Sequence, residues 1–140
     1  MQIGAENAIQ LPLILEIYEG DWISIWRTLG IGFAHDVLVG FDGTVYENSG
    51  PGGKVRRNKL TSVLRGAVVV NVISRASNPS EVVRRVTEAE RMLNTPWSVF
   101  YNCQDFASEV VTGLPRSFQR DAVVGLGIVF LAGMLWGNSE

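Results

Sequence analysis

The chain contains one cysteine, Cys103, and one histidine, His35, and these two side chains together could carry out thiol chemistry. A thiolate attacks a carbonyl carbon, while an imidazole takes up the thiol proton and later delivers it to the leaving group. Cys103 opens a helical pattern that Asn102 can cap, and the first turn of a helix stabilises a thiolate through its unpaired N–H groups and the helix dipole. A buried structural cysteine and an ordinary core or surface histidine are the alternative interpretation.

A predicted hairpin supplies a third candidate side chain, Glu47. The turn signal Asp42-Gly43 separates two strand-like runs, the first of which begins at His35. If the loop has three residues, with Gly43 in the left-handed position, Val37 pairs with Glu47, and His35 projects from the same side of the sheet. Glu47 could then accept a hydrogen bond from the imidazole and orient it, as the third member of a catalytic triad does. A two-residue turn would move Glu47 to the other face, so the loop length decides whether the triad can form.

Composition limits the other functions that the chain could have. Its 140 residues suit one domain with a core of its own, and the formal net charge of −2 argues against nucleic acid as the main partner. A single cysteine excludes an internal disulfide and is consistent with a reducing compartment such as the cytoplasm. One histidine and one cysteine lack further ligands at zinc spacing, so no metal site is predicted. No phosphate-binding glycine motif is present, and we expect no cofactor.

Hydrophobic patterns predict both strands and helices. A β-type run covers residues 22–26, the hairpin follows, and a β-branched run over 67–73 is expected to be a buried strand. Asn78 can cap a helix whose apolar residues recur at helical spacing as far as Leu93. A further helix is predicted from Cys103 to Thr112, ending at a glycine.

A basic stretch follows the glycine-rich loop after the hairpin. A solvated loop is its commonest explanation, and contact with anionic lipid headgroups or RNA is the functional alternative. Its basic residues, with no acidic residue among them, are Lys54, Arg56, Arg57, Lys59 and Arg65.

The end of the chain is unusually apolar. Residues 122–137 carry no charge, and their length is close to the roughly 20 residues that span a bilayer. Arg116 and Arg120 precede them, as expected of a membrane anchor whose preceding domain stays cytoplasmic. A helix packed on the core and a homodimer contact are the alternatives. The predicted organisation is an N-terminal arm (1–19), one domain (20–121) and this apolar segment (122–137), which is expected to act as a membrane anchor.

Several motifs, taken in order, resemble those of one family, the H-box/NC proteins. This group contains lecithin:retinol acyltransferase and the phospholipase A and acyltransferase (HRAS-like suppressor) proteins. The resemblance runs from about Gly20 to Trp136. Its motifs are Gly20-Asp21-Trp22-Ile23-Ser24-Ile25-Trp26-Arg27, His35 with Val37-Leu38-Val39-Gly40 and Gly43, Asn102-Cys103-Gln104-Asp105-Phe106 with Gly113, and Arg116-Ser117, Gln119 and Arg120-Asp121 before the apolar segment.

The resemblance implies an α+β, circularly permuted papain-like (NlpC-type) fold, with an antiparallel sheet packed on helices and an apolar C-terminal helix. It implies that an acyl group passes from a phospholipid to a cysteine thioester and then to water or an amine. By position, Cys103 is the nucleophile and His35 the base. Asn102, Gln104 and Asp105 fall in the family's NC box and would support the helix that carries the nucleophile.

The chain also departs from the family pattern. Glu47 stands where the family usually has a second histidine, Asp36 stands where an aromatic residue is usual, and Gln104-Asp105 replaces Glu-His. A retained framework around an altered site resembles the H-box/NC 2A proteins of some picornaviruses, which implies a role in viral RNA replication or in engaging host factors. The second hypothesis is therefore a non-catalytic module whose partners are host proteins and intracellular membranes in the cytoplasm of a host cell.

Overall fold

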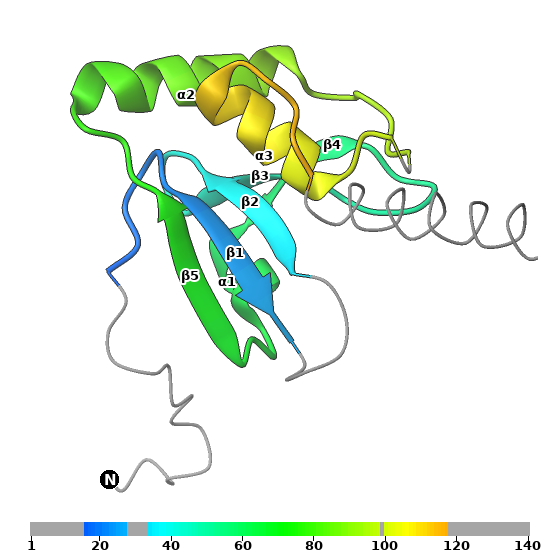
Figure 1. The fold of residues 1–140 in the computed structure, drawn as a ribbon. Helices are drawn as coiled ribbons and strands as arrows, with labels where there is room; N and C mark the ends of the chain where they lie inside the picture. The colour runs from blue at the N-terminus through cyan, green and yellow to red at the C-terminus, as the bar shows by residue number, and fades with distance from the viewer. Residues whose placement is uncertain (1–15, 28–33, 99, 118–140) are drawn as a thin grey trace, which may run out of the picture.

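The computed structural model describes residues 16–27, 34–98 and 100–117, and they form an α+β fold around a five-stranded sheet (Figure 1). The strand order is β4-β3-β2-β1-β5, and every neighbouring pair is antiparallel. The elements are β1 (Trp22–Trp26), β2 (His35–Val39), β3 (Thr44–Asn48), β4 (Val55–Lys59), α1 (Leu60–Leu64), β5 (Val69–Ser74), α2 (Pro79–Arg91) and α3 (Cys103–Thr112).

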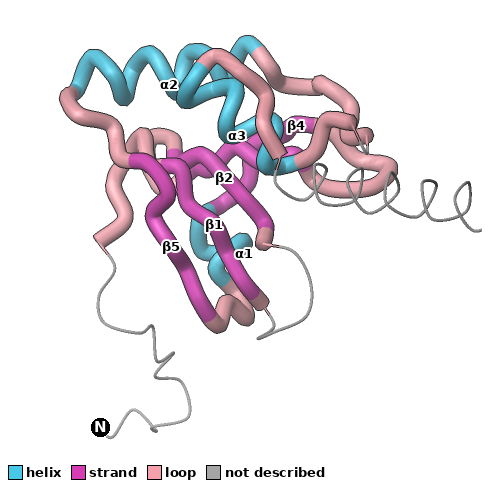
Figure 2. Tube along the Cα trace, in the orientation of Figure 1, coloured by secondary structure: helices cyan, strands magenta, loops and turns pink. Residues whose placement is uncertain are grey.

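The sheet separates two hydrophobic clusters, because alternate residues of a strand point to opposite faces. Helices α2 and α3 cover one face, and α1 packs on the other, as the tube in Figure 2 shows. The first cluster includes Leu38, Tyr46, Val55, Val86, Phe106 and Val110. The second includes Ile23, Ile25, Val37, Val39, Val45 and Val63.

The β2–β3 hairpin has the register that a three-residue loop requires. Val37 pairs with Glu47, as predicted. Asp42 and Gly43 have φ values of 54° and 71°, in the left-handed region that glycine and, less readily, aspartate can adopt. Because side chains two residues apart share a face, this register places His35 and Glu47 on the same side of the sheet.

Helix α3 begins and ends where the sequence predicts. The Asn102 side-chain oxygen accepts hydrogen bonds from the backbone N–H groups of Gln104 (2.9 Å) and Asp105 (3.4 Å). The Asp105 carboxylate accepts one from the Asn102 N–H at 3.1 Å, which completes a capping box. Gly113 ends the helix in the left-handed conformation, with φ of 80°. Local side-chain and backbone chemistry therefore places Cys103 in the first turn.

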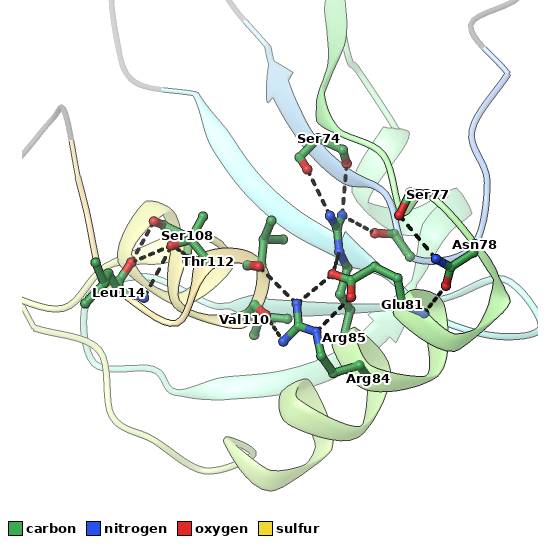
Figure 3. Close-up of polar contacts among 12 residues, drawn as sticks. Ser74, Ser77, Asn78, Glu81, Arg84, Arg85, Ser108, Val110, Thr112 and Leu114 are labelled. Carbon is green, nitrogen blue, oxygen red and sulfur yellow. Dashed lines mark hydrogen bonds and ion pairs between the residues drawn. The ribbon is translucent and has the colours of Figure 1, made fainter.

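Helix α2 is capped by Asn78, as predicted, and its arginines tie it to the neighbouring elements (Figure 3). The buried guanidinium of Arg85 donates to the carbonyl oxygen of Gly20 at 2.9 Å and to the hydroxyl of Ser74 at 3.0 Å. Arg84 donates to the carbonyl oxygen of Val110 in α3 at 3.2 Å. These bonds hold α2 against the sheet and against the helix that carries the cysteine.

One expectation about the burial of a strand and one about secondary structure are wrong. The run over 67–73, expected to be a buried strand, forms β5 at one edge of the sheet, where Ile73 is 50% exposed. The basic stretch is not a loop, because residues Val55–Lys59 form β4 at the opposite edge and α1 follows directly. An edge strand tolerates exposed charged side chains, which also discourage pairing with other chains.

The predicted apolar segment 122–137 and most of the predicted N-terminal arm lie outside the described residues. In the ranges that are described, no helix combines the length and the apolar character needed to span a bilayer.

Candidate functional site

The predicted contact between His35 and Glu47 is present. Nε2 of His35, at the start of β2, lies 2.7 Å from Oε2 of Glu47 in β3. The imidazole side chain is 22% exposed and the carboxylate side chain is 4% exposed. A hydrogen bond to an ionised carboxylate in so sheltered a position is strong, and the hairpin register fixes both partners.

Cys103 lies against the start of β2, where His35 begins the strand. Its Sγ donates to the carbonyl oxygen of Ala34 at 3.8 Å, and the cysteine is close enough to the imidazole to help raise the pKa of His35. The thiol is free and buried, with 8% of the residue exposed. The cap on α3 and the register of the hairpin thus bring together the three side chains that the sequence singled out, Cys103, His35 and Glu47.

Two residues of β4 bind the other oxygen of the Glu47 carboxylate. Nε of Arg56 donates to Oε1 at 2.9 Å, and Nδ2 of Asn58 donates to the same oxygen at 3.0 Å. Sequence reasoning misses Asn58 and assigns Arg56 only to anion contact, because a run of basic residues predicts a loop. The sequence carries no signal for this contact; pairing of the strand with β3 is what places residues 56 and 58 on one face.

The pKa values of the central pair are shifted in opposite directions. Burial lowers the pKa of His35, but hydrogen bonds with Cys103 and Glu47, together with their charges, outweigh burial and raise it to about 9. Burial raises the pKa of Glu47, but hydrogen bonds from His35, Asn58 and Arg56 and the imidazole charge lower it to about 2. At neutral pH the site therefore holds an imidazolium beside a carboxylate.

Asp36, next to His35 in β2, is a second buried carboxyl group near the imidazole. Its Oδ2 accepts a hydrogen bond from the indole Nε1 of Trp22 at 2.9 Å. Burial raises the pKa of Asp36 above its ordinary value. Hydrogen bonds with Ser24 and Trp22 and the charge of His35 act in the opposite direction but do not outweigh burial. The bond between Trp22 and Asp36 thus ties β1 to β2 next to His35.

Asn102, Gln104 and Asp105, which flank the cysteine, support the helix that carries it. Beyond the capping box, Nδ2 of Asn102 donates to the hydroxyl of Ser117 at 2.8 Å, and that hydroxyl donates to Oε1 of Gln104 at 3.2 Å. Asp105 and Ser117 are fully buried. This network connects the first turn of α3 to the segment that follows the helix.

The predicted anion-contact residues have different environments. Arg56 binds Glu47, and Arg57 forms an ion pair with Glu90 of α2. The remaining three, Lys54, Lys59 and Arg65, are not buried. Their contact with anionic lipid or RNA stays a prediction.

Across the described ranges, no group of three or more histidine, cysteine, aspartate or glutamate side chains gathers in a way that could hold a metal ion.

A groove of about 690 Å³ lies elsewhere on the molecule. It is lined by Ile17, Tyr18, Glu19, Phe41, Arg75, Ala76, Pro79, Val82 and Val83. The lining residues include none of the three side chains at the candidate site. The groove is therefore separate from the place where Cys103 would act.

No protein-family model matches the chain, and no curated protein matches it either. The H-box/NC resemblance therefore stays a prediction that rests on the motifs themselves.

Proposed function

We propose that the protein is an H-box/NC thiol acyl hydrolase or acyltransferase, with phospholipid as the acyl donor. The observation that carries the proposal is the grouping of the Cys103 thiol, the His35 imidazole and the Glu47 carboxylate, whose Oε2 lies 2.7 Å from Nε2. An antiparallel sheet next to a helix with cysteine in its first turn also supports the proposed circularly permuted papain-like fold.

The raised pKa of His35 favours a mechanism that begins from a thiolate–imidazolium pair. The Cys103 thiolate attacks the ester carbonyl carbon, and the imidazolium gives its proton to the departing alcohol oxygen, which leaves a thioester. The neutral imidazole then takes a proton from water or an amine as that nucleophile attacks the thioester, and departure of the Cys103 thiolate from the acyl carbon restores the thiolate–imidazolium pair. Because Nε2 of His35 is hydrogen-bonded to Glu47, Nδ1 is the ring nitrogen that remains to exchange a proton with the Cys103 sulfur.

The proposal is tested by trapping the acyl-enzyme. The full chain is incubated with phospholipid vesicles, and intact-protein mass spectrometry measures addition of one acyl group that hydroxylamine removes. We expect this adduct on the native chain and none on Cys103→Ala, with His35→Ala forming it much more slowly. Equal acylation of the native chain and Cys103→Ala, or no acylation of either, would overturn the proposal.

We propose a non-catalytic, viral 2A-type module as the second candidate. It is favoured by the burial of Cys103 and by the use of Gln104 and Asp105, which replace the family's Glu-His, as structural supports of α3. In this role the framework would bind host proteins, and the apolar segment 122–137 would contact a membrane. If Cys103→Ala supports full biological activity while loss of 122–137 abolishes it, the binding role is preferred; a folded but inactive Cys103→Ala protein contradicts it.

A further inference from the structure

We infer that Arg56 and Asn58 are positioning residues of this site, which act from β4 by holding the Glu47 carboxylate so that Oε2 faces Nε2 of His35. The inference deepens the proposed thiol chemistry and rests on it for its functional meaning. Its physical content, the control of one imidazole by two residues of a neighbouring strand, can be measured without a substrate.

The two oxygens of the Glu47 carboxylate have different partners. Oε1 accepts from Nε of Arg56 at 2.9 Å and from Nδ2 of Asn58 at 3.0 Å, and Nη2 of Arg56 also lies 2.9 Å from it. Oε2 lies 2.7 Å from Nε2 of His35. A glutamate side chain has three rotatable bonds, so a single hydrogen bond leaves it several rotamers. Two donors on Oε1 fix the plane of the carboxylate and thereby the direction of Oε2.

The β3–β4 ladder explains why these two residues reach the carboxylate. Arg56 lies directly opposite Glu47, and Asn58 lies opposite Val45, so the two donors share the face on which Glu47 lies. The Glu47 side chain is 4% exposed, whereas that of Arg56 is 54% exposed. A buried carboxylate that lost its donors would gain by moving toward water, and this would take it away from the imidazole.

Removing these donors affects the pKa of His35 in two opposite ways. The direction of the observed shift therefore distinguishes loss of carboxylate orientation from mere loss of the positive charge of Arg56. Loss of the Arg56 cation by itself favours the imidazolium and raises the pKa of His35. Loss of carboxylate orientation removes one of the two groups, Cys103 and Glu47, that raise the pKa of His35, and so lowers that pKa toward its ordinary value of 6.5. The other ionisable groups beside the imidazole, Cys103 and Asp36, are unchanged in the variants.

The experiment uses the fact that the chain has one histidine and one cysteine. Proton NMR follows the imidazole Cε1–H signal through a pH titration, and the rate of iodoacetamide alkylation at pH 6 reports the thiolate. In the double variant Arg56→Ala/Asn58→Ala we expect the pKa of His35 to fall by at least about one unit and the alkylation rate to fall about tenfold. Arg56→Lys, which keeps a donor, should stay close to the native chain.

Arg57→Ala is the matched control, because it removes the same charge from the adjacent position of β4, where the side chain binds Glu90 instead of Glu47. It should leave both readouts unchanged. Asn58→Ala alone replaces the double variant if circular dichroism shows that the double variant does not fold. An unchanged or raised pKa of His35 in the folded double variant, or in Asn58→Ala where that variant replaces it, would overturn the inference. If the variants respond as expected but the native chain forms no acyl-enzyme, only the proposed function fails.

Discussion

The charge state of His35 determines what this residue can do. An imidazole with a pKa of about 9 already carries its proton at neutral pH, so in the proposed mechanism it would serve first as the partner of a thiolate and as a proton donor. Contacts with Cys103 and with Glu47 raise this pKa, and the carboxylate at position 47 stabilises an imidazolium as a second imidazole would not. The carboxylate at position 47 therefore makes the contact with His35 an ion pair.

Replacing His35 by Ala tests this role directly. Without the imidazolium, the thiolate loses its counter-charge and the leaving alcohol loses its proton donor, so acyl transfer should slow by about a hundredfold or more. The rate of acyl-enzyme formation on vesicles measures the effect. His35→Gln, which keeps a polar side chain of similar reach, should be impaired to a similar degree. Activity within about threefold of the native chain in either variant would contradict a proton-transfer role.

The His35–Glu47 pair should also make stability depend on pH. The pKa of His35 is raised from 6.5 to about 9 in the folded chain, so its contribution to stability is fully present below pH 6.5 and is lost as the pH rises through 9. The free energy of unfolding should fall by on the order of 1 to 3 kcal/mol over this window. Urea denaturation at a series of pH values measures it.

Glu47→Gln is the control for this pH dependence. Glutamine keeps the size of the side chain and removes the charge that supports the imidazolium, so the fall between pH 6.5 and 9 should become clearly smaller. The pKa of Glu47 is lowered from 4.5 to about 2, so its own contribution is present above pH 4.5 and is lost as the pH falls through 2. Identical pH profiles for the two chains would show that the pair does not stabilise the fold.

At the scale of elements, the first turn of α3 is where a local change should affect the chemistry. Asn102→Ala removes the capping box and the bond to Ser117, and should lower stability by about 1 to 2 kcal/mol. Because the thiolate depends on an ordered first turn, alkylation of Cys103 at pH 6 should slow by several-fold. Thermal unfolding and the alkylation rate measure the two effects.

A second helix cap provides the control for this prediction. Asn78 caps α2 by accepting a hydrogen bond from the Glu81 N–H at 2.9 Å, and Asn78→Ala should cost about 1 kcal/mol. It should leave the alkylation rate unchanged, because α2 does not carry the thiol. If the two variants change the reactivity of Cys103 equally, the cap on α3 has no specific role at the site.

The predictable parts of the fold are those with local signals. Asn102 and Gly113 mark both ends of α3, and Asp42-Gly43 marks the hairpin, so the elements that carry Cys103, His35 and Glu47 can be predicted from the amino-acid sequence. Such signals are carried by a few residues close together in the chain. The sequence leaves the loop length open, and the register seen in the structure decides the face on which Glu47 lies.

The parts that could not be predicted depend on contacts between distant segments. The positions of β4 and β5 at opposite edges of the sheet follow from the strand order, which no single segment encodes. A run of basic residues has no apolar alternation, so the sequence predicts a loop where β4 lies and gives no sign that Asn58 binds Glu47. The family resemblance supplies the expectation of a permuted papain-like fold, while the local patterns supply the site.

At the scale of the whole molecule, both hydrophobic clusters and the three site residues are built from residues 16–117. The bond between Asn102 and Ser117 also lies within this range. A chain that ends at Arg120 therefore retains every described contact of the core and the site. Circular dichroism and the titration of His35 can verify that it folds, which makes it a suitable comparison for the role of the apolar segment.

The last prediction concerns that apolar segment, residues 122–137. Burying it in lipid would remove a continuous apolar surface from water at roughly 25 cal/mol per Å², whereas exposing it would create a patch larger than soluble monomers usually carry. We expect the full chain to float with liposomes in a density gradient and the chain ending at Arg120 to stay in the dense fractions. Cys103→Ala, which keeps the segment, should float like the native chain, so that acylation is not required. A full chain that behaves as a soluble monomer without detergent would contradict membrane contact, and the segment would then pack against its own domain.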